Sequence, residues 1–490
     1  MRALAPRSLL IVAWGCMALA VVWSAPVGRT YYVDSSTGSD GKDGLSPATA
    51  WRTLAPANAR EFTPGDRLLL KAGTAYAGPL SLHGRGTPSA PIVVGKYGTG
   101  PLPKISNGPG GPPVVEVLNS EYFEIADLEL VGGAIGVFAY IKDFGVAHHL
   151  HFLRLSIHDV SGGTTGDTGG FLLKREGEDT WFDDLLIEGC TIEHADRNGI
   201  LLTDYPTASD KHHSTHVVIR GNRLRDIGGD GVFILGCDGA VMDGNVVSYA
   251  HQRVGRQPGE RACAGMWPHR CNGTIVENNE VDHTAVGGVT VWDSEAFDDD
   301  NTCRNTVFQY NFSHDNAGGF LLMCGGARGT VVRYNVSQKD AIALFTLEGD
   351  GTGQATIYNN TFYIGPNLSV NLARNTFGHP RGLRFLNNLF YADGSLSYDF
   401  GGIQDVSFSH NAFWGNHHGR PADSGAVLAS PMLVAPGSGK DGCASLDGYK
   451  LRPGSPCSGA GEVVPNNGGR DFWGRAVPQD QPPGIGADGN

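Results

Sequence analysis

The stretch from Cys263 to Cys324 indicates the fold most clearly. It reads CAGMWPHRC (263–271), NNEVDHTAVGGVTVWDSEAFDDDNTC (278–303) and QYNFSHDNAGGFLLMC (309–324). Short apolar runs alternate with Gly and Asn turns, and Trp, His, Arg and clustered carboxylates fall within the same frame. This pattern predicts three successive turns of a solenoid that carry the functional surface.

The same frame extends along the chain. Asn followed two residues later by an apolar residue recurs at Asn222, Asn245, Asn279, Asn360, Asn388 and Asn411. A second anchor, Gly or Ala before an apolar run, recurs at Gly199, Gly231, Gly265, Gly288, Gly319 and Ala341. The second set of anchors recurs every 22 to 34 residues. Repeats of this length without a recurring helix favour a parallel β-helix. In such a fold, stacked Asn side chains can form a hydrogen-bonded ladder.

The composition narrows the class of protein. The chain has 490 residues, of which 71 are glycine and only 18% are charged, and many tight turns between short apolar runs indicate an all-β fold. The formal net charge is −13, which argues against nucleic acid or an anionic membrane as the main partner. A polyanionic substrate would need a local basic patch or a bound cation.

The N-terminus has the pattern of a secretory signal peptide over residues 1–25. Arg2 and Arg7 precede an apolar run, 9–22, and the small residues Ser24 and Ala25 follow. The run is short for a membrane span, so we expect a secreted or periplasmic protein without stable membrane association, an uncleaved anchor being the alternative. Eight further cysteines permit disulfides in an exported protein; their connectivity stays open, and free buried thiols are the alternative.

Both ends of the chain carry further motifs. The N-terminal part reads YYVDSSTGSDG (31–41), GLSPATAW (44–51) and TPGDRLLLKAG (63–73), and the C-terminal part reads SPCSGAG (455–461), DFWGRAVP (471–478) and GIGADG (484–489). With the repeats, they make the chain resemble the right-handed parallel β-helix proteins of the pectate-lyase-like superfamily. The resemblance implies a capping segment over 31–113, a right-handed β-helix over 114–416 and an irregular C-terminal segment over 417–490.

The Gly anchors predict which side chains meet on the outer surface. Alternate residues of a strand point to the same side, and successive coils lie about 4.8 Å apart. His269 and Arg270 then occupy the same positions as Trp292 and Asp293 one coil later. We therefore predict a catalytic cluster with Trp residues beside it that stack on sugar rings or pack as satellite core. Its members are His269, Arg270, Asp293, Glu295 and His314, beside Trp267 and Trp292.

An acidic run from Asp293 to Asp300 is predicted to lie in a protruding loop, Ser294–Arg304. It suits a Ca²⁺ site with Asp298 and Asp299 as ligands, a pair of acid and base carboxylates, or a solvated turn. Arg270 beside Asp293 would keep that carboxylate ionised, while Glu295 could hold a raised pKa.

The histidines His194, His283 and His314 recur at one position of the coils, with Asp226 and Tyr249 at that position in the coils between, and a structural polar ladder would also explain this column. His314 is the best functional candidate among them, because it lies one coil after the acidic run. Lys339, a further coil on, is a weaker candidate base.

The resemblance covers polysaccharide lyases, glycoside hydrolases, epimerases and adhesins, and no complete catalytic motif of one family is present. We expect an exported, monomeric enzyme that cleaves a polysaccharide, a lyase in preference to a hydrolase. A lyase could use Arg270 or a cation to neutralise a uronate and His269 or His314 as base. A hydrolase would use Asp293 and Glu295 with Asp298. A non-catalytic carbohydrate-binding or cell-surface protein is the alternative.

Overall fold

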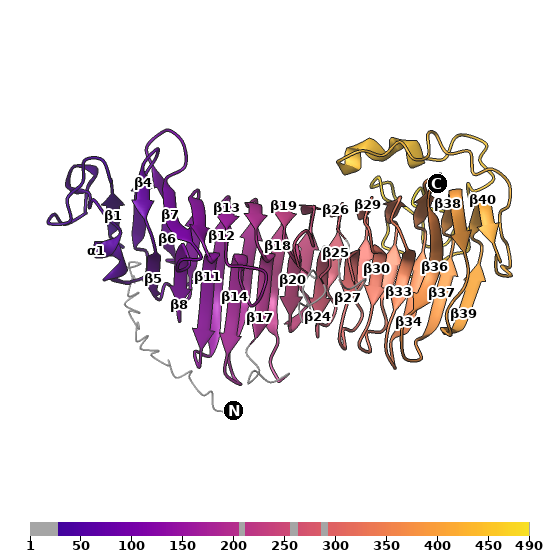
Figure 1. The fold of residues 1–490 in the computed structure, drawn as a ribbon, viewed down its shortest axis with the longest axis horizontal. Coiled ribbons are helices and arrows are strands. Elements are labelled where there is room, and N and C mark those ends of the chain that lie inside the picture. The colour runs from indigo at the N-terminus through magenta and orange to yellow at the C-terminus, as the bar shows by residue number, and fades with distance from the viewer. Residues whose placement is uncertain (1–27, 205–210, 255–262, 286–292, 490) are drawn as a thin grey trace, which may run out of the picture.

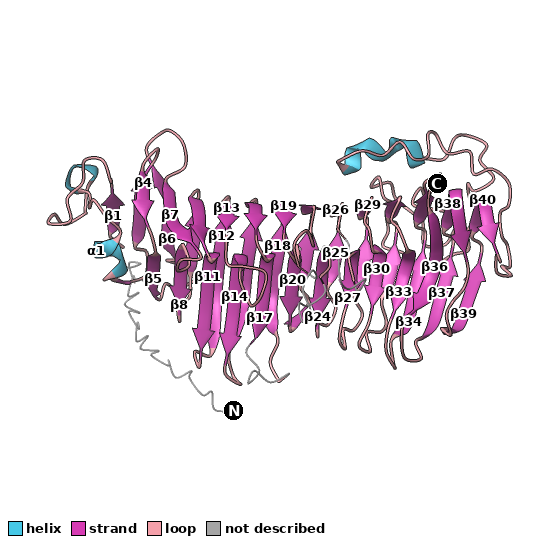
Figure 2. Cartoon of the chain, viewed as in Figure 1, coloured by secondary structure: helices cyan, strands magenta, loops and turns pink. Residues whose placement is uncertain are grey.

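The chain winds into one long solenoid with three faces of stacked strands (Figure 1). The computed structural model describes residues 28–204, 211–254, 263–285 and 293–489. Among these described residues, strands run from Thr30 to His418, and the helices lie only towards the two ends (Figure 2). The structure thus confirms the predicted all-β solenoid.

A typical coil contributes one strand to each face, in the order face 1, face 2, face 3. Face 1 consists of β1 (Thr30–Val33), β3 (Arg67–Lys71), β6 (Ile92–Tyr97), β9 (Phe123–Ala126), β12 (Val146–Leu153), β15 (Trp181–Glu188), β18 (Ser214–Arg220), β21 (Cys237–Asp238), β22 (Val241–Asp243), β25 (Ile275–Glu277), β28 (Val307–Gln309), β31 (Val331–Arg333), β34 (Gly353–Tyr358), β37 (Arg381–Leu386) and β39 (Gln404–Ser409). Face 2 consists of β4 (Ala75–Ala77), β7 (Lys104–Pro109), β10 (Glu129–Gly133), β13 (Ser156–Val160), β16 (Thr191–Ala195), β19 (Arg223–Ile227), β23 (Val246–Ser248), β26 (Glu280–Asp282), β29 (Phe312–His314), β32 (Val336–Gln338), β35 (Thr361–Ile364), β38 (Leu389–Ser397) and β40 (Ala412–His418). Face 3 consists of β2 (Glu61–Phe62), β5 (Leu80–Gly84), β8 (Val115–Leu118), β11 (Ile135–Lys142), β14 (Gly169–Glu176), β17 (Asn198–Asp204), β20 (Val232–Leu235), β24 (Met266–His269), β27 (Glu295–Asp299), β30 (Gly319–Met323), β33 (Ala343–Leu347) and β36 (Ser369–Asn375). The helices are η1 (Pro47–Thr49), α1 (Ala55–Asn58) and η2 (Cys443–Tyr449).

Inward side chains stack in register from coil to coil and form the core. On face 3, Ile200 pairs with Val232 and Val232 with Met266 in parallel strands, and all three side chains are fully buried. Leu201 follows Ile200 along its strand, and Phe233 follows Val232. Both side chains point outward because side chains alternate along a strand. This stack fixes which side chains reach the outer surface of face 3.

Buried asparagines connect the coils at the turn between faces 1 and 2, as the sequence predicts. Asn279 Oδ1 accepts hydrogen bonds from Asn245 N (2.8 Å) and Nδ2 (3.0 Å), and its Nδ2 donates to Asn311 Oδ1 (3.1 Å) and Met242 O (2.9 Å). The ladder consists of Asn222, Asn245, Asn279, Asn311, Asn335, Asn360, Asn388 and Asn411. Asn311 and Asn335 connect Asn279 to Asn360 within this ladder.

The coil that follows β24 differs from the predicted register. The sequence suggested a strand over 288–292, which lies outside the described residues, and a loop over Ser294–Arg304. Instead, β27 (Glu295–Asp299) pairs with β24 through Met266 and Phe297. The acidic segment expected to protrude is a buried strand, because Phe297 enters the core with no exposed surface.

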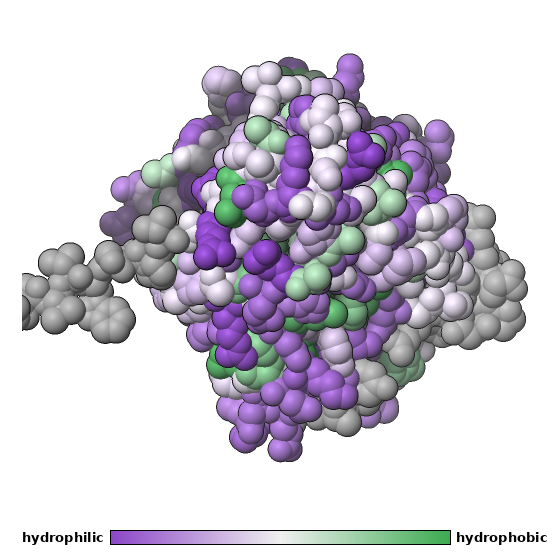
Figure 3. All heavy atoms as spheres, turned by 90° about the vertical axis from the view of Figure 1, so that its left-hand side faces the viewer, coloured by the Kyte–Doolittle hydropathy of each residue, from purple (hydrophilic) through white to green (hydrophobic). Residues whose placement is uncertain are grey.

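Parallel strands begin within the segment expected to cap the solenoid. β1 pairs with β3 and β3 with β6, all before residue 114. The short helix α1 lies in the same segment, between β1 and β2. Seen end-on in Figure 3, this end is mainly hydrophilic or neutral, with small hydrophobic patches. Residues 31–113 therefore contribute the first coils, and their role as a cap stays a prediction.

The C-terminal segment after β40 folds back over face 2 (Figure 1). Its residues Leu446 and Tyr449 form a buried apolar cluster with Phe312 and Val336 of face 2. Among its described residues, η2 is the only helix or strand of this segment.

The eight cysteines in the described part of the chain form no disulfide. Cys237, Cys271 and Cys303 stack in successive coils, where Cys237 N donates to Cys271 Sγ (3.3 Å) and Cys271 N to Cys303 Sγ (3.3 Å). Of the two alternatives that the sequence left open, the structure has buried thiols instead of disulfides.

The predicted signal peptide, residues 1–25, lies outside the described residues. In the part that the structure describes, no helix combines the length and apolar character needed to cross a membrane. Export therefore stays a prediction.

Candidate functional site

A hollow of about 520 Å³ lies on the outer side of face 3, beside the turns that lead into it from face 2. Its apolar lining comes from β17, β20 and β24: Leu201, Phe233, Leu235 and Trp267. Its charged or titratable lining consists of Asp167, Arg197, Asp230, His269, Asp293 and Asp300. The predicted site residues Trp267, His269 and Asp293 thus meet in one hollow.

Trp267 and Phe233 form an aromatic platform in this hollow. They pair in register on neighbouring strands, and their rings stack with centroids 3.9 Å apart and an interplanar angle of 8°. Trp267 Nε1 donates to Asp230 Oδ1 (2.9 Å), and Arg197 Nη2 lies 3.5 Å from Asp230 Oδ2. These contacts hold the indole in one orientation, which suits stacking on a sugar ring. Trp292, the other predicted stacking residue, lies outside the described residues.

His269 and Asp300 lie side by side on adjacent coils. His269 Nδ1 is 3.4 Å from Asp300 Oδ2, and burial lowers the pKa of His269, which favours the neutral imidazole. Asp300 Oδ1 accepts hydrogen bonds from Asn301 N (2.6 Å) and Nδ2 (2.9 Å) and from the Cys324 thiol. Asp300 thus accepts three hydrogen bonds beside His269.

Asp293 enters the hollow from the turn between faces 2 and 3. The backbone is left-handed at Asp293 (φ 62°) and Ser294 (φ 87°), a costly conformation for non-glycine residues that clusters at functional sites. Ser294 Oγ pairs with His251 Nδ1 (2.8 Å), and the Ser294 carbonyl accepts from Gly318 N (3.1 Å). Burial and the nearby Glu295 carboxyl raise the pKa of Asp293 well above its usual value, which favours its protonated, acid form.

The charge of the hollow is mainly negative. Four aspartates line it; burial favours the uncharged form of Asp293, and the other three are at positions 167, 230 and 300. Among the lining residues that the structure describes, Arg197 is the only Arg or Lys, and it faces Asp230. A uronate carboxylate would therefore meet like charge here, whereas a neutral sugar would not.

Arg270 and Glu295 lie near the hollow but are not among its described lining residues. Arg270 Nη2 donates to Asp204 Oδ2 (2.6 Å). Glu295 is fully buried, and Arg374 Nη2 lies 3.6 Å from its Oε1. Burial raises the pKa of Glu295 to about 7, which agrees with the raised pKa expected from the sequence. The expectation that Arg270 keeps Asp293 ionised is wrong, because burial and neighbouring carboxyls prevail there.

Asp298 and Asp299 do not face one cation together. Asp299 Oδ1 accepts from Thr306 Oγ1 (2.7 Å) and its Oδ2 from Thr330 Oγ1 (2.5 Å). Asp298 is the next residue of the strand and points to the other side, where burial and Asp300 raise its pKa. The predicted pair of ligands is therefore wrong, and Ca²⁺ binding elsewhere along this segment stays a prediction.

His314 lies on face 2, outside the hollow. Its Nδ1 pairs with Asp315 Oδ2 (3.0 Å) and its Nε2 with Glu280 Oε1 (3.3 Å). Gly442 N, from the C-terminal segment, donates to the same Glu280 oxygen (2.6 Å). The expectation that His314 joins the catalytic cluster is wrong, because β29 ends before the turn that brings the chain to face 3.

The His314 contacts should make stability depend on pH. Burial alone would lower the pKa of His314, but the bonds to Asp315 and Glu280 raise it to about 10. Since the folded-state pKa exceeds the unfolded value of about 6.5, this stabilisation is complete below about pH 6.5 and is lost as pH rises through about 10. In urea unfolding from pH 6 to 10.5, His314→Gln should show a smaller decline in the free energy of unfolding than the wild type.

His216 provides the matched control. It also pairs with a carboxylate, Asp183 (2.7 Å), but its side chain is 79% exposed, so His216→Gln should retain the wild-type decline. A His314→Gln variant that keeps the full decline would contradict this account.

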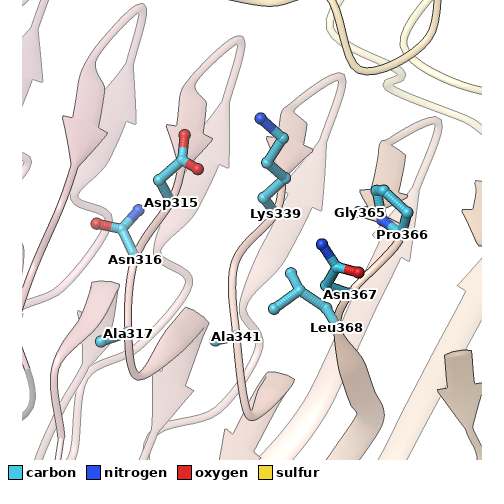
Figure 4. A pocket seen from close by; sticks show the side chains of 9 residues that line it. All are labelled: Asp315, Asn316, Ala317, Lys339, Ala341, Gly365, Pro366, Asn367 and Leu368. Atoms are coloured by element: carbon cyan, nitrogen blue, oxygen red, sulfur yellow. The ribbon is translucent and has the colours of Figure 1, made fainter. Parts of the chain in front are cut away.

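A second hollow of about 550 Å³ lies farther along the solenoid. Figure 4 shows Asp315 and Lys339, on consecutive coils, pointing to the same side, with Asn367 and Leu368 on the next coil. The hollow contains the weaker candidate base Lys339 but only one carboxylate among its described lining residues. It therefore lacks the pair of carboxyl groups present in the first hollow.

Sequence reasoning missed Asp300, Asp230 and Arg197. Asp300 belonged to the recognised acidic run, and once Phe297 is placed in the core, strand alternation puts Asp298 and Asp300 on the outer side. Asp230 lies between two glycines in the turn one coil before Cys263. The pairing of Arg197 with Asp230 had no signal in the sequence.

Comparisons with known proteins agree with the fold. A family described as "Right handed beta helix region" matches residues 182–362. The crystal structure of a GH136 lacto-N-biosidase from Eubacterium ramulus is similar, with a TM-score of 0.59 and 22% identity over 77% of this chain and 68% of that one. The right-handed parallel β-helix predicted from the sequence is thereby confirmed.

Two glycosidases are similar in sequence. The chain is 26% identical to Lacto-N-biosidase of Bifidobacterium longum subsp. longum over 577 aligned residues, which cover 92% of this chain and 36% of that enzyme. It is 31% identical to Alpha-1,3-galactosidase A of Akkermansia muciniphila over 115 residues, 21% of this chain and 19% of that one. The chain thus spans about a third of the length of the Bifidobacterium enzyme.

Proposed function

We propose that this right-handed β-helix protein is an exported glycoside hydrolase that cleaves a neutral glycan in the hollow on face 3. The observation that carries the proposal is the pair Asp293 and Asp300, two carboxyl groups in different environments within one hollow. The names of the relatives, a lacto-N-biosidase and an α-1,3-galactosidase, support the same reaction class.

The two carboxyl groups suit different steps of hydrolysis. A glycoside hydrolase needs one carboxylic acid to protonate the leaving oxygen and one carboxylate to act as nucleophile or base. Asp293, whose pKa is raised by burial, takes the acid role. Asp300, which accepts hydrogen bonds from Asn301 and Cys324, takes the carboxylate role beside His269.

Binding of the glycan falls to the aromatic platform. Trp267, fixed by Asp230 and stacked on Phe233, offers a flat apolar surface to the C–H face of a sugar ring. Stacking on an aromatic ring orients the sugar without requiring charge, which agrees with a neutral substrate.

The charge of the hollow is the reason to prefer hydrolysis over the lyase reaction expected from the sequence. A lyase must neutralise a uronate carboxylate with a cation. The described arginine of the hollow already faces Asp230, and the remaining charged groups are carboxyls.

The experiment is a glycan panel with two readouts. Purified protein is incubated with neutral oligosaccharides, including lacto-N-biose and α-1,3-galactose termini, and with uronate polymers. We expect new reducing ends from a neutral glycan and no rise in the absorbance of unsaturated uronate. Unsaturated products would establish a lyase, and binding without cleavage would establish a non-catalytic carbohydrate-binding protein.

A further inference from the structure

Face 1 carries a second group of titratable side chains, away from the hollow on face 3. His149 and His151 flank Leu150 in β12, and Leu150 is buried and pairs with Phe123 of β9. Glu124, the next residue of β9, pairs in register with His151. Two imidazoles and a carboxylate therefore meet on neighbouring strands.

The backbone turns His149 towards this group. His149 and Asp184 have left-handed conformations, with φ of 55° and 61°, which non-glycine residues adopt rarely. The ring centroids of His149 and His151 lie 3.8 Å apart. Asp184 Oδ2 is 2.7 Å from His149 Nδ1, and Asp184 Oδ1 is 3.0 Å from His151 Nε2. Three successive coils thus converge on one point of face 1.

The spacing of the potential ligand atoms is that of a metal site. Glu124 Oε1 lies 3.3 Å from His149 Nε2, and one ligand atom each from Glu124, His149 and His151 lie within 4.8 Å of one another. Two ligands at about 2.0–2.1 Å from a tetrahedral Zn²⁺ are about 3.4 Å apart. The first pair already has this separation, so an ion would require only small side-chain movements.

We infer that Glu124, His149 and His151 bind one divalent transition-metal ion of the zinc class. Imidazole nitrogens select Zn²⁺, Co²⁺ or Ni²⁺, whereas Ca²⁺ and Mg²⁺ take oxygen ligands. The side chains of His149, Glu124 and His151 are 22%, 35% and 16% exposed. The ion can therefore enter from solvent, and water can complete its coordination.

Asp184 acts as a positioning residue for this site. A carboxylate that accepts a hydrogen bond from one ring nitrogen of a histidine directs the other nitrogen to the metal. Asp184 accepts from His149 Nδ1–H, which leaves the Nε2 lone pair facing Glu124. Loss of such a partner lowers metal affinity about 10–100-fold, and we expect this loss in Asp184→Asn.

Two other groups of histidine and carboxylate side chains lack features that the group of Glu124, His149 and His151 has. The group of Glu280, Asp282 and His314 contains a single histidine, and the His314 side chain is only 3% exposed, so an ion there would have one imidazole ligand and little access from solvent. His158 lies 3.2 Å from Glu129 and 2.8 Å from Asp159, but among the described residues it belongs to no group of three ligand atoms close enough to share one ion. His158 therefore provides a matched control.

The test uses the full chain, without an affinity tag and freed of metal by a chelator. Zn²⁺ binding is measured by calorimetry, and Co²⁺ binding by visible absorption. We expect one ion per chain, with a loss of affinity of at least 100-fold in the His149→Ala/His151→Ala double variant and none in His158→Ala. The Co²⁺ spectrum should show a tetrahedral site without a thiolate-to-cobalt band, which separates this site from the free cysteines.

Glu124→Gln, which preserves the shape of its side chain, guards against loss of folding and should also weaken binding. Circular dichroism verifies that each variant is folded. Undiminished Zn²⁺ binding by the double variant or by Glu124→Gln, a thiolate band, or equal loss in His158→Ala would overturn the inference. Because none of these readouts is turnover, the outcome is independent of the proposed hydrolase activity.

Discussion

Asp300→Asn and Asp293→Asn should each lower kcat/KM on a cleavable glycan by about 10²–10⁴-fold, the contribution of a positioned acid or base. Asn keeps the shape of Asp but cannot give or take the required proton, and at Asp300 it cannot act as a nucleophile. Initial rates of the purified variants measure the effect. Both variants should remain folded, because the coil around them is set by the buried stack that includes Phe297.

Asp167 is the control within the same hollow. It lines the hollow but forms an exposed pair with Lys174 (3.0 Å), so Asp167→Asn should change kcat/KM little. Equal losses in all three variants would indicate a general electrostatic effect and would contradict specific roles for Asp293 and Asp300.

Asp293→Asn should also alter the pH dependence of stability. The folded-state pKa of Asp293 is raised above the unfolded value, so its contribution is present at low pH and is lost as pH rises through the folded-state pKa. The variant has no charge to bury and should lose less stability over that range in urea unfolding.

Asn279→Ala should lower the free energy of unfolding by about 3 kcal/mol, the upper end for an unpaired buried polar group. The substitution removes the hydrogen bonds that the Asn279 side chain makes with Asn245 Nδ2, Asn311 Oδ1 and Met242 O. Asn388→Ala should act similarly, since Asn388 bonds Asn360 and Asn411 in the same way. Urea denaturation at neutral pH measures the change.

Asn272→Ala provides the comparison for the ladder. Asn272 is exposed and its Nδ2 donates to Asp238 Oδ1 (2.7 Å), so its loss should cost far less than that of Asn279. Wild-type stability in Asn279→Ala would contradict the ladder and the alignment of the coils.

The fold was predictable because its signals are local and repeated. Each ladder asparagine precedes a strand at the same turn of successive coils, and the buried stack through Val232 and Met266 follows from alternation. Because the repeat recurs in many coils, a strand predicted at the wrong position in one coil does not change the predicted architecture.

The site was only partly predictable because it depends on single residues in an irregular coil. The Gly288 anchor led to the expectation of a strand over 288–292, which lies outside the described residues. In the structure, Glu295–Asp299 is a strand that pairs with β24, and Asp300 lies beside His269. The prediction that His314 belongs to the catalytic cluster was wrong for a different reason. The spacing of residues in the sequence does not show on which side of the next turn a side chain lies.

The central claim is that a glycosidic bond is hydrolysed in the hollow formed by Trp267, His269, Asp293 and Asp300. The most direct measurement is mass spectrometry of the products formed from a neutral glycan in H₂¹⁸O by wild-type protein and by Asp300→Asn. The account predicts one ¹⁸O at the new reducing end with the wild type and a strongly reduced yield of that product with the variant. An unsaturated, unlabelled product, or labelled product formed equally by both proteins, would contradict it.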